Sequence, residues 1–275
     1  MKKVIRWVVM GLLLAIFLFS GISVAATLYR YEVSDQRYED AAEQFVAVAG
    51  DRDYIEGPDL EAGQEPEAGD GEEESWELPP ITVDFEGLKA VNSDVTGWIY
   101  GEDTLIDYPV VQGEDDEFYL HHSYDKSESS SGSIFVEAGN RPGFADANTI
   151  IYGHHMKNKS MFASLSYWGD QAYYEEHPVL WLLTPQQDYK IVLFAGYTTS
   201  ATSDTYTIFQ ETGTELEEYI MASAAQSDFQ TSVEPGGKKQ YVLLSTCAYS
   251  FDNARYVLHG ILEPVHSAGG VRKSE

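Results

Sequence analysis

The sequence contains a single cysteine, Cys247, among 275 residues, so the chain can form no internal disulfide bond. In an exported protein a lone cysteine is either a free reactive thiol or an intermolecular link. Basic residues are also scarce: 17 Lys and Arg stand against 45 Asp and Glu, which gives a formal net charge of −28. This acidity disfavours nucleic acids and anionic lipids as partners, because both are polyanions.

Charged residues are absent between Val8 and Leu28. A run of about 20 apolar residues can span a bilayer as a helix, and the basic residues before the run would stay on the cytoplasmic side. We therefore expect residues 1–30 to form a basic cytoplasmic end and a transmembrane anchor, with the bulk of the protein outside the cell. A cleaved signal peptide is the alternative, since residues 23–25 are small, although the apolar run exceeds the usual signal core of about 7 to 15 residues.

Two segments separate this run from the part of the chain that can build a core. Residues 31–49 place apolar side chains roughly on one helical face, which predicts a juxtamembrane helix. Residues 50–80 combine many acidic residues with glycines, prolines and few apolar side chains. They cannot bury enough apolar surface to fold alone, so we expect a flexible, self-repelling linker. The folded domain is assigned to residues 81–265 and a C-terminal tail to residues 266–275.

Short strand-like runs and turns dominate the folded domain. The runs cover residues 97–100, 106–111, 132–136, 148–152, 179–183, 189–197, 241–245 and 255–262. Many short strands at this spacing favour a closed barrel or a sandwich. Helical patterns are expected at residues 83–91, at 160–166 with a continuation through 171–175, and at 215–225.

The only cysteine lies between two of these runs, 241–244 and 256–261, which are joined by a short polar segment and therefore predict a β-hairpin. Cys247 would lie where the first strand ends and Arg255 where the second begins. Hairpin geometry would return the arginine to the cysteine, so that its guanidinium could face a thiol or an oxyanion formed on it.

A second informative stretch, residues 149–156, is a strand that runs into Gly153, His154 and His155. Glycine allows the backbone to turn sharply at a strand end, which would present His154 at the rim of a barrel. A thiol needs a proton acceptor or an imidazolium neighbour to become a useful nucleophile, and histidine is the usual supplier. His154, Cys247 and Arg255 thus form a possible set of acid/base, nucleophile and cationic stabiliser.

The order Tyr-Gly-His154, then Leu-Ser-Thr-Cys247, then Arg255 eight residues later resembles the sortase family of cysteine transpeptidases. The runs Ile106–Gly113 and Gly132–Phe135, together with a helix inserted before the cysteine-bearing strand, look like class B of that family. The resemblance covers roughly residues 81–264. In the family pattern the catalytic histidine directly follows the glycine, which favours His154 over the adjacent His155.

The resemblance implies a mainly β fold: a closed eight-stranded barrel with N-terminal helices and a helix before the cysteine-bearing strand. It also implies an enzyme that cleaves exported proteins after a threonine in a C-terminal sorting signal, through a thioacyl intermediate. The acyl group would pass to an amine of a cell-wall precursor or of a pilin. Cys247 would attack the threonine carbonyl, and His154 would donate a proton to the leaving amine and later accept one from the incoming amine. Arg255 and the backbone N–H after Cys247 would stabilise the oxyanion.

By the same resemblance, four further residues would lie along the substrate groove: Leu120, Tyr152, Tyr206 and Ser245. No cofactor is implied. We also expect no metal, because the calcium dependence of some class A sortases does not transfer to this chain. The enzyme would act on the outer face of a Gram-positive-type cell membrane.

The sequence leaves three other interpretations of the function open. A cysteine peptidase that uses water as the acceptor is compatible with the same barrel and the same three residues. An anchored, non-catalytic binding module with an inert thiol would also fit, because an unpaired cysteine is often a small buried hydrophobe. An L,D-transpeptidase fits less well, since the Ser-His-Gly type context of its cysteine is absent around Cys247.

Overall fold

The structure is a computed structural model that describes residues 2–49, 78–247 and 253–265. Nearly all of the acidic linker expected at residues 50–80 and the whole tail expected at residues 266–275 lie outside these ranges.

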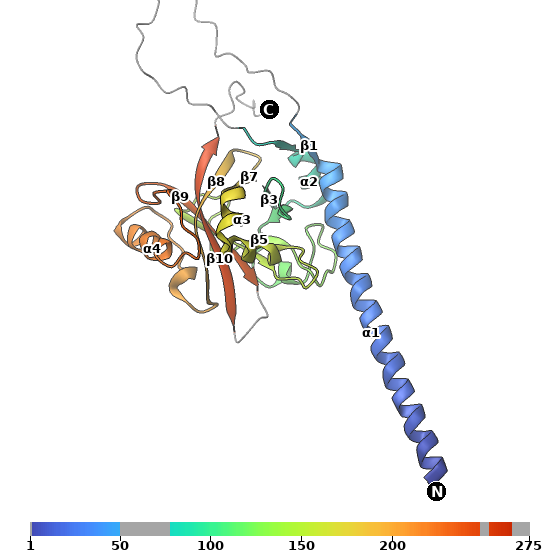
Figure 1. Cartoon of the computed structure of the whole chain (residues 1–275). Coiled ribbons are helices and arrows are strands. Elements are labelled where there is room, and N and C mark those ends of the chain that lie inside the picture. The colour runs from blue at the N-terminus through green and yellow to red at the C-terminus, as the bar shows by residue number, and fades with distance from the viewer. Residues whose placement is uncertain (1, 50–77, 248–252, 266–275) are drawn as a thin grey trace, which may run out of the picture.

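The N-terminal residues form one continuous helix, α1 (Lys2–Phe45). Its first half projects away from the rest of the molecule, and its second half runs along the side of the barrel (Figure 1). At about 1.5 Å per residue, its 44 residues extend well beyond the roughly 30 Å of hydrocarbon in a bilayer. By length and composition the helix could cross a membrane, and none of its most apolar window is buried.

Eight strands close into a barrel in the order β10-β8-β7-β3-β4-β5-β6-β9, which confirms the predicted fold. Their bounds are β3 (Val95–Tyr100), β4 (Asp107–Val111), β5 (Ile134–Val136), β6 (Asn148–His154), β7 (Val179–Leu183), β8 (Asp188–Ser200), β9 (Gln240–Cys247) and β10 (Ala254–Val265). Two neighbouring pairs, β4 with β5 and β6 with β9, are parallel, and the others are antiparallel. The barrel is therefore mixed, and the cysteine-bearing strand lies between β6 and β10.

Outside the barrel, β1 (Val46–Val48) pairs with β2 (Ile81–Val83) in a two-stranded ribbon that joins the end of α1 to the domain. The remaining helical segments are α2 (Phe85–Val91), η1 (Phe118–Leu120), η2 (Phe162–Gly169), α3 (Gln171–Glu176), η3 (Asp204–Tyr206) and α4 (Thr214–Ala224). The helix expected before the cysteine-bearing strand is α4.

Two of the expected helices differ from the structure at their starts. The helix expected from residue 83 begins at Phe85, because Asp84 caps it by accepting a hydrogen bond from the Gly87 N–H at 3.0 Å. The helical stretch expected from residue 160 begins at Phe162 and is divided at Asp170, whose carboxylate accepts hydrogen bonds from the Ala172 and Tyr173 N–H groups. The 3₁₀ segment η2 precedes this cap and α3 follows it.

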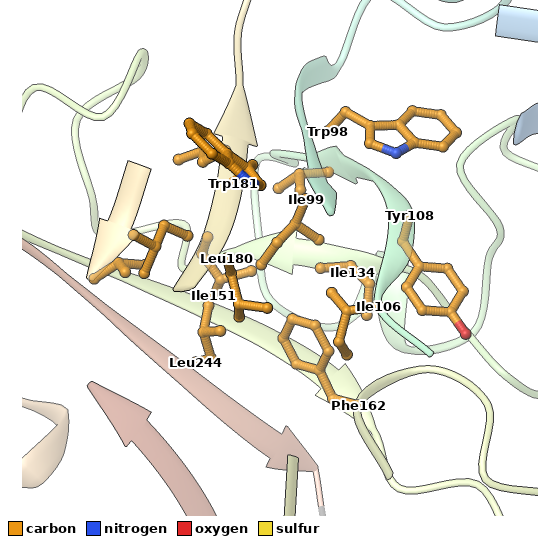
Figure 2. Packing of buried hydrophobic residues seen from close by; sticks show 14 of the residues in the cluster. Trp98, Ile99, Ile106, Tyr108, Ile134, Ile151, Phe162, Leu180, Trp181 and Leu244 are labelled. Atoms are coloured by element: carbon orange, nitrogen blue, oxygen red, sulfur yellow. The ribbon is translucent and has the colours of Figure 1, made fainter. Parts of the chain in front are cut away.

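The barrel encloses apolar side chains that converge from several strands (Figure 2). Ile99 of β3, Ile134 of β5, Ile151 of β6, Leu180 of β7 and Leu244 of β9 are all fully buried there. Burial of a side chain of this size contributes about 1.5–3 kcal/mol. The parallel register pairs Ile151 with Leu244, so the core fixes how β6 and β9 lie against each other.

Candidate active site

The parallel register of β6 and β9 pairs His154 with Cys247 at the ends of the two strands. Neighbouring strands lie about 4.8 Å apart, so the backbones of the two residues are side by side although they are far apart in the sequence. The predicted acid/base residue and the predicted nucleophile are thus brought to one end of one strand pair.

The residue before the histidine is glycine because the barrel interior leaves no space for a side chain there. Strand residues alternate between faces, and Ile151 lies in the core, so Gly153 also points inward. A Cβ at Gly153 would lie 2.5 Å from Ile134 Cδ1 and 2.7 Å from Phe162 Cγ. The same alternation turns His154 and Tyr152 to the outer face of the barrel wall.

His154 is covered by the connection between β4 and β5 and is only 5% exposed. Its Nε2 lies 2.7 Å from the Leu120 carbonyl oxygen. A carbonyl oxygen can only accept, so Nε2 carries a proton in this hydrogen bond, and Nδ1 is the nitrogen that can exchange protons in the neutral ring. Burial lowers the pKa of His154, and His121 and Arg255 lower it further, while the bond to Leu120 opposes the shift. The neutral imidazole is therefore favoured near neutral pH.

Arg255 lies near the start of β10, which runs antiparallel to β9 with Val257 opposite Ser245. Continuing this register brings Arg255 toward the end of β9. Its Nη1 donates a hydrogen bond to the Thr246 carbonyl oxygen at 3.3 Å. The guanidinium is thus held against the residue that directly precedes Cys247, as expected for a hairpin. Residues 248–252, including the expected oxyanion donor after Cys247, lie outside the described ranges.

A pocket of about 330 Å³ collects His154 and Arg255 with three of the four predicted groove residues, Leu120, Tyr152 and Tyr206. The fourth, Ser245, is fully buried and does not line it. Its hydroxyl lies 2.9 Å from the Tyr206 hydroxyl, so Ser245 supports the pocket wall from behind.

The structure adds an acidic wall to this pocket that the sequence analysis missed. Asp116, Phe135, Glu137, Ala201 and Asn253 also line it. Glu137 accepts a hydrogen bond from the Tyr152 hydroxyl at 2.8 Å. Burial and the neighbouring Asp116 raise the pKa of Glu137.

No local signal distinguishes the two carboxylates of this wall. Asp116 belongs to the acidic run Glu114–Glu117, which is typical of a solvated turn. Glu137 follows a short strand and belongs to no motif. The adjacent His155, considered above as an alternative to His154, forms a bridge with Met161 and does not line the pocket. Within the described ranges, no group of three or more His, Cys, Asp or Glu residues could hold a metal ion.

Comparison with known proteins shows that the chain matches a known family. The family model for the sortase domain matches residues 101–263. Sortase B of Listeria monocytogenes is 33% identical over 254 residues, which cover 90% of this chain and 93% of the relative. A Staphylococcus aureus sortase B–substrate complex superposes with a TM-score of 0.63 at 29% identity, over 66% of this chain and 85% of that one. A sortase B complexed with triglycine superposes with a TM-score of 0.62 at 30% identity, over 66% and 86% of the two chains.

Proposed function

This chain belongs to the sortase family of cysteine transpeptidases and is similar to sortase B, and we propose that it joins exported proteins to an amine acceptor at the cell surface. The substrates would carry a C-terminal sorting signal that is cleaved after a threonine. The observation that carries the proposal is the pairing of His154 with Cys247 across β6 and β9, with Arg255 bonded to the carbonyl of Thr246.

In the acylation step the Cys247 thiolate attacks the threonine carbonyl carbon and forms a C–S bond. The carbonyl electrons move to oxygen, and this oxyanion is stabilised by the Arg255 guanidinium and by the backbone N–H that follows Cys247. When the oxyanion collapses, the C–N bond breaks and protonated His154 gives its proton to the leaving amine. The products are a thioacyl enzyme and the released C-terminal peptide.

In the second step an amine attacks the thioacyl carbon, and neutral His154 takes the proton that the nitrogen loses. The C–S bond then breaks and the cysteine leaves as a thiolate, so the enzyme returns to its starting state. The low pKa of His154 suits this basic role, since most of the imidazole is neutral near pH 7. The hydrogen bond from Nε2 to Leu120 keeps Nδ1 as the proton-exchanging nitrogen in both steps.

The pocket beside His154 and Arg255 is the proposed binding site for the sorting signal. Leu120, Tyr152 and Tyr206 would contact the peptide, and Ser245 would hold Tyr206 through their hydroxyl pair. The half-buried ring of Tyr152 lies 6.2 Å from that of Tyr206, nearly parallel to it at 25°. Two such rings offer a flat apolar surface to an extended peptide.

We further propose that α1 anchors the enzyme in the cell membrane, with a cytoplasmic N-terminus and the barrel outside. The apolar run before Tyr29 supports the anchor, and the basic residues at its start support this orientation. The acceptor would be an amine of a peptidoglycan precursor or a pilin lysine. A related sortase B has been captured with triglycine, which is itself an amine.

The full-length chain in detergent micelles tests this proposal. A peptide panel randomised around one threonine is incubated with triglycine, and the products are identified by mass spectrometry. We expect cleavage after threonine and a product in which the threonine carboxyl is joined to triglycine, and we expect both to be lost in Cys247→Ala.

Three results would contradict parts of the proposal. Equal turnover by Cys247→Ala would reject the nucleophile. Cleavage with water as the sole acceptor would indicate a cysteine peptidase. Failure of a thiol-reactive electrophile to label Cys247 in the folded chain would favour a non-catalytic binding module.

A further inference from the structure

The second half of α1 packs against the catalytic domain with one face. Ser34, Tyr38, Ala41 and Phe45 are each at most 5% exposed, and their spacing of three or four residues puts them on one side of the helix. The helix therefore contributes side chains to the domain beyond any role as a tether.

The polar contacts of this face reach the connection between β4 and β5, residues 112–133. The Tyr38 hydroxyl donates to the Gly132 carbonyl oxygen at 2.5 Å and accepts a hydrogen bond from the Ser123 hydroxyl at 3.3 Å. One turn earlier, the Ser34 hydroxyl lies 3.4 Å from that of Ser129. The Tyr38 ring also packs edge-to-face on Tyr108 of β4, with 5.4 Å between ring centres. Tyr38 is thus held both by the barrel and by the connection.

The same connection covers the catalytic histidine. Gly132 has a positive φ of 57°, and a Cβ there would lie 2.8 Å from the Leu120 carbonyl oxygen and 2.9 Å from His154 Cδ2. Gly132 therefore lies directly against both the imidazole and the Leu120 carbonyl to which that imidazole is bonded. A displacement of Gly132 towards these groups must move one or both of them, and a displacement away from them removes their packing partner.

We propose that Tyr38 is a positioning residue for the transpeptidation, acting through Gly132 on the orientation of His154. The proposal rests on the proposed function, in which Nδ1 of His154 exchanges protons with the two amines. With Tyr38 in place, Gly132 stays against the imidazole and the Leu120 carbonyl stays within bonding distance of Nε2. Without the hydroxyl, the connection loses the hydrogen bonds that join Gly132 and Ser123 to Tyr38, and Gly132 is no longer held against the imidazole.

One consequence is that α1 links two parts of the proposed enzyme. The apolar half of the helix would lie in the membrane, while Tyr38, ten positions after Leu28, holds the wall of the active site. The docking of this one helix against the barrel then governs both the placement of the domain at the membrane and the geometry of His154.

Tyr38→Phe in the full-length chain tests the proposal, because it keeps the ring on Tyr108 and removes only the hydroxyl. We expect kcat to fall by about 10- to 100-fold, as displacements of about 1 Å at catalytic groups do, with KM changed less than about threefold. The acid limb of the pH profile should also move to lower pH, because the bond to Leu120 raises the pKa of His154 and would be weakened. A merely structural role would leave this limb in place.

Arg37→Gln is the matched control. Arg37 forms an ion pair at 3.6 Å with Asp125, so it joins the same helix to the same connection through Asp125 rather than through Gly132. We expect the kcat of this variant to stay within about twofold of wild type, and the acid limb of its pH–rate profile to stay within a few tenths of a pH unit. The reason is that partly exposed ion pairs contribute little to stability. An equal loss in both variants, or an unchanged profile in Tyr38→Phe, would overturn the proposal.

The rate of Cys247 alkylation as a function of pH provides a readout that needs no peptide substrate. If no peptide is turned over by wild type, the proposed function fails, but the acid limb of alkylation should still move in Tyr38→Phe. Should that variant not fold, as judged by circular dichroism, Ser123→Ala removes the hydrogen bond to the Tyr38 oxygen and is expected to shift the limb in the same direction. No shift in Ser123→Ala would then reject the proposal.

Discussion

Acidification from pH 7 to 5 should destabilise the barrel through a histidine outside the active site, His259 of β10. This side chain is 1% exposed. Its Nε2 lies 3.1 Å from the Tyr197 hydroxyl, and its ring stacks on that of Tyr197 with 5.4 Å between centres. Burial lowers the pKa of His259 from 6.5 to about 3. The folded protein therefore keeps this imidazole neutral throughout the mildly acidic range.

The size of the effect follows from proton linkage. Above pH 6.5 the histidine is mostly neutral in both the folded and the unfolded chain, so it adds no pH dependence. Below that pH the unfolded chain binds a proton that the folded chain does not, and the free energy of unfolding falls by about 1.4 kcal/mol for each pH unit. Between pH 6.5 and 5 the loss from His259 alone is about 2 kcal/mol.

Urea unfolding of the full-length chain at pH 7 and pH 5, followed by near-UV circular dichroism, measures this loss. The comparison variant is His259→Gln, whose amide can still bond to the Tyr197 hydroxyl but does not titrate. His154 also has a lowered pKa and contributes equally in both proteins, so the difference isolates His259. We expect the variant to lose about 2 kcal/mol less than wild type on acidification. Equal losses in the two proteins would refute the reasoning.

Three further predictions concern the site itself. Gly153→Ala should destabilise the protein by about 1–3 kcal/mol in the same urea assay, because the new methyl group overlaps Ile134 and Phe162. Arg255→Lys should lower kcat by about 10²–10³, the usual effect of losing one oxyanion donor, with little change in KM, since lysine keeps the charge but not the planar fork. The acid limb of kcat/KM should lie below pH 6.5, because burial lowers the pKa of His154; a limb at or above pH 7 in the pH–rate profile would contradict this.

Local patterns in the sequence are sufficient to predict most of the barrel. The run at residues 179–183 agrees with β7 at both ends, because its apolar residues stop at a Thr-Pro turn. The strand expected at 189–197 is longer in the structure, where β8 continues to Ser200. Its last residues pair with the start of β10, as Ser200 does with Ala254. The local alternation of apolar residues does not indicate pairing with a strand so distant in the sequence, so the extra length of β8 could not be predicted.

Each predicted catalytic residue lies in a short sequence motif, whereas the two acidic residues of the pocket wall lie in none. Glu137 directly follows β5, and the long connection before β5 places Asp116 beside it in the pocket wall. In the sequence, Tyr38 is one of several apolar positions on one face of a predicted helix. Its contact with Gly132 depends on how α1 docks, which is a property of the folded chain.

The register that brings His154 beside Cys247 and the packing of the core are two results of the same strand pairing. No hairpin joins β6 to β9, because they are parallel neighbours, so a turn cannot fix their alignment. The alignment is fixed instead by interior contacts such as the pair Ile151 and Leu244. A slip of β6 by one residue would turn its whole outer face inward, moving His154 into the core and Gly153 to the pocket. Selection for a well-packed interior therefore also keeps the histidine beside the strand end that carries Cys247.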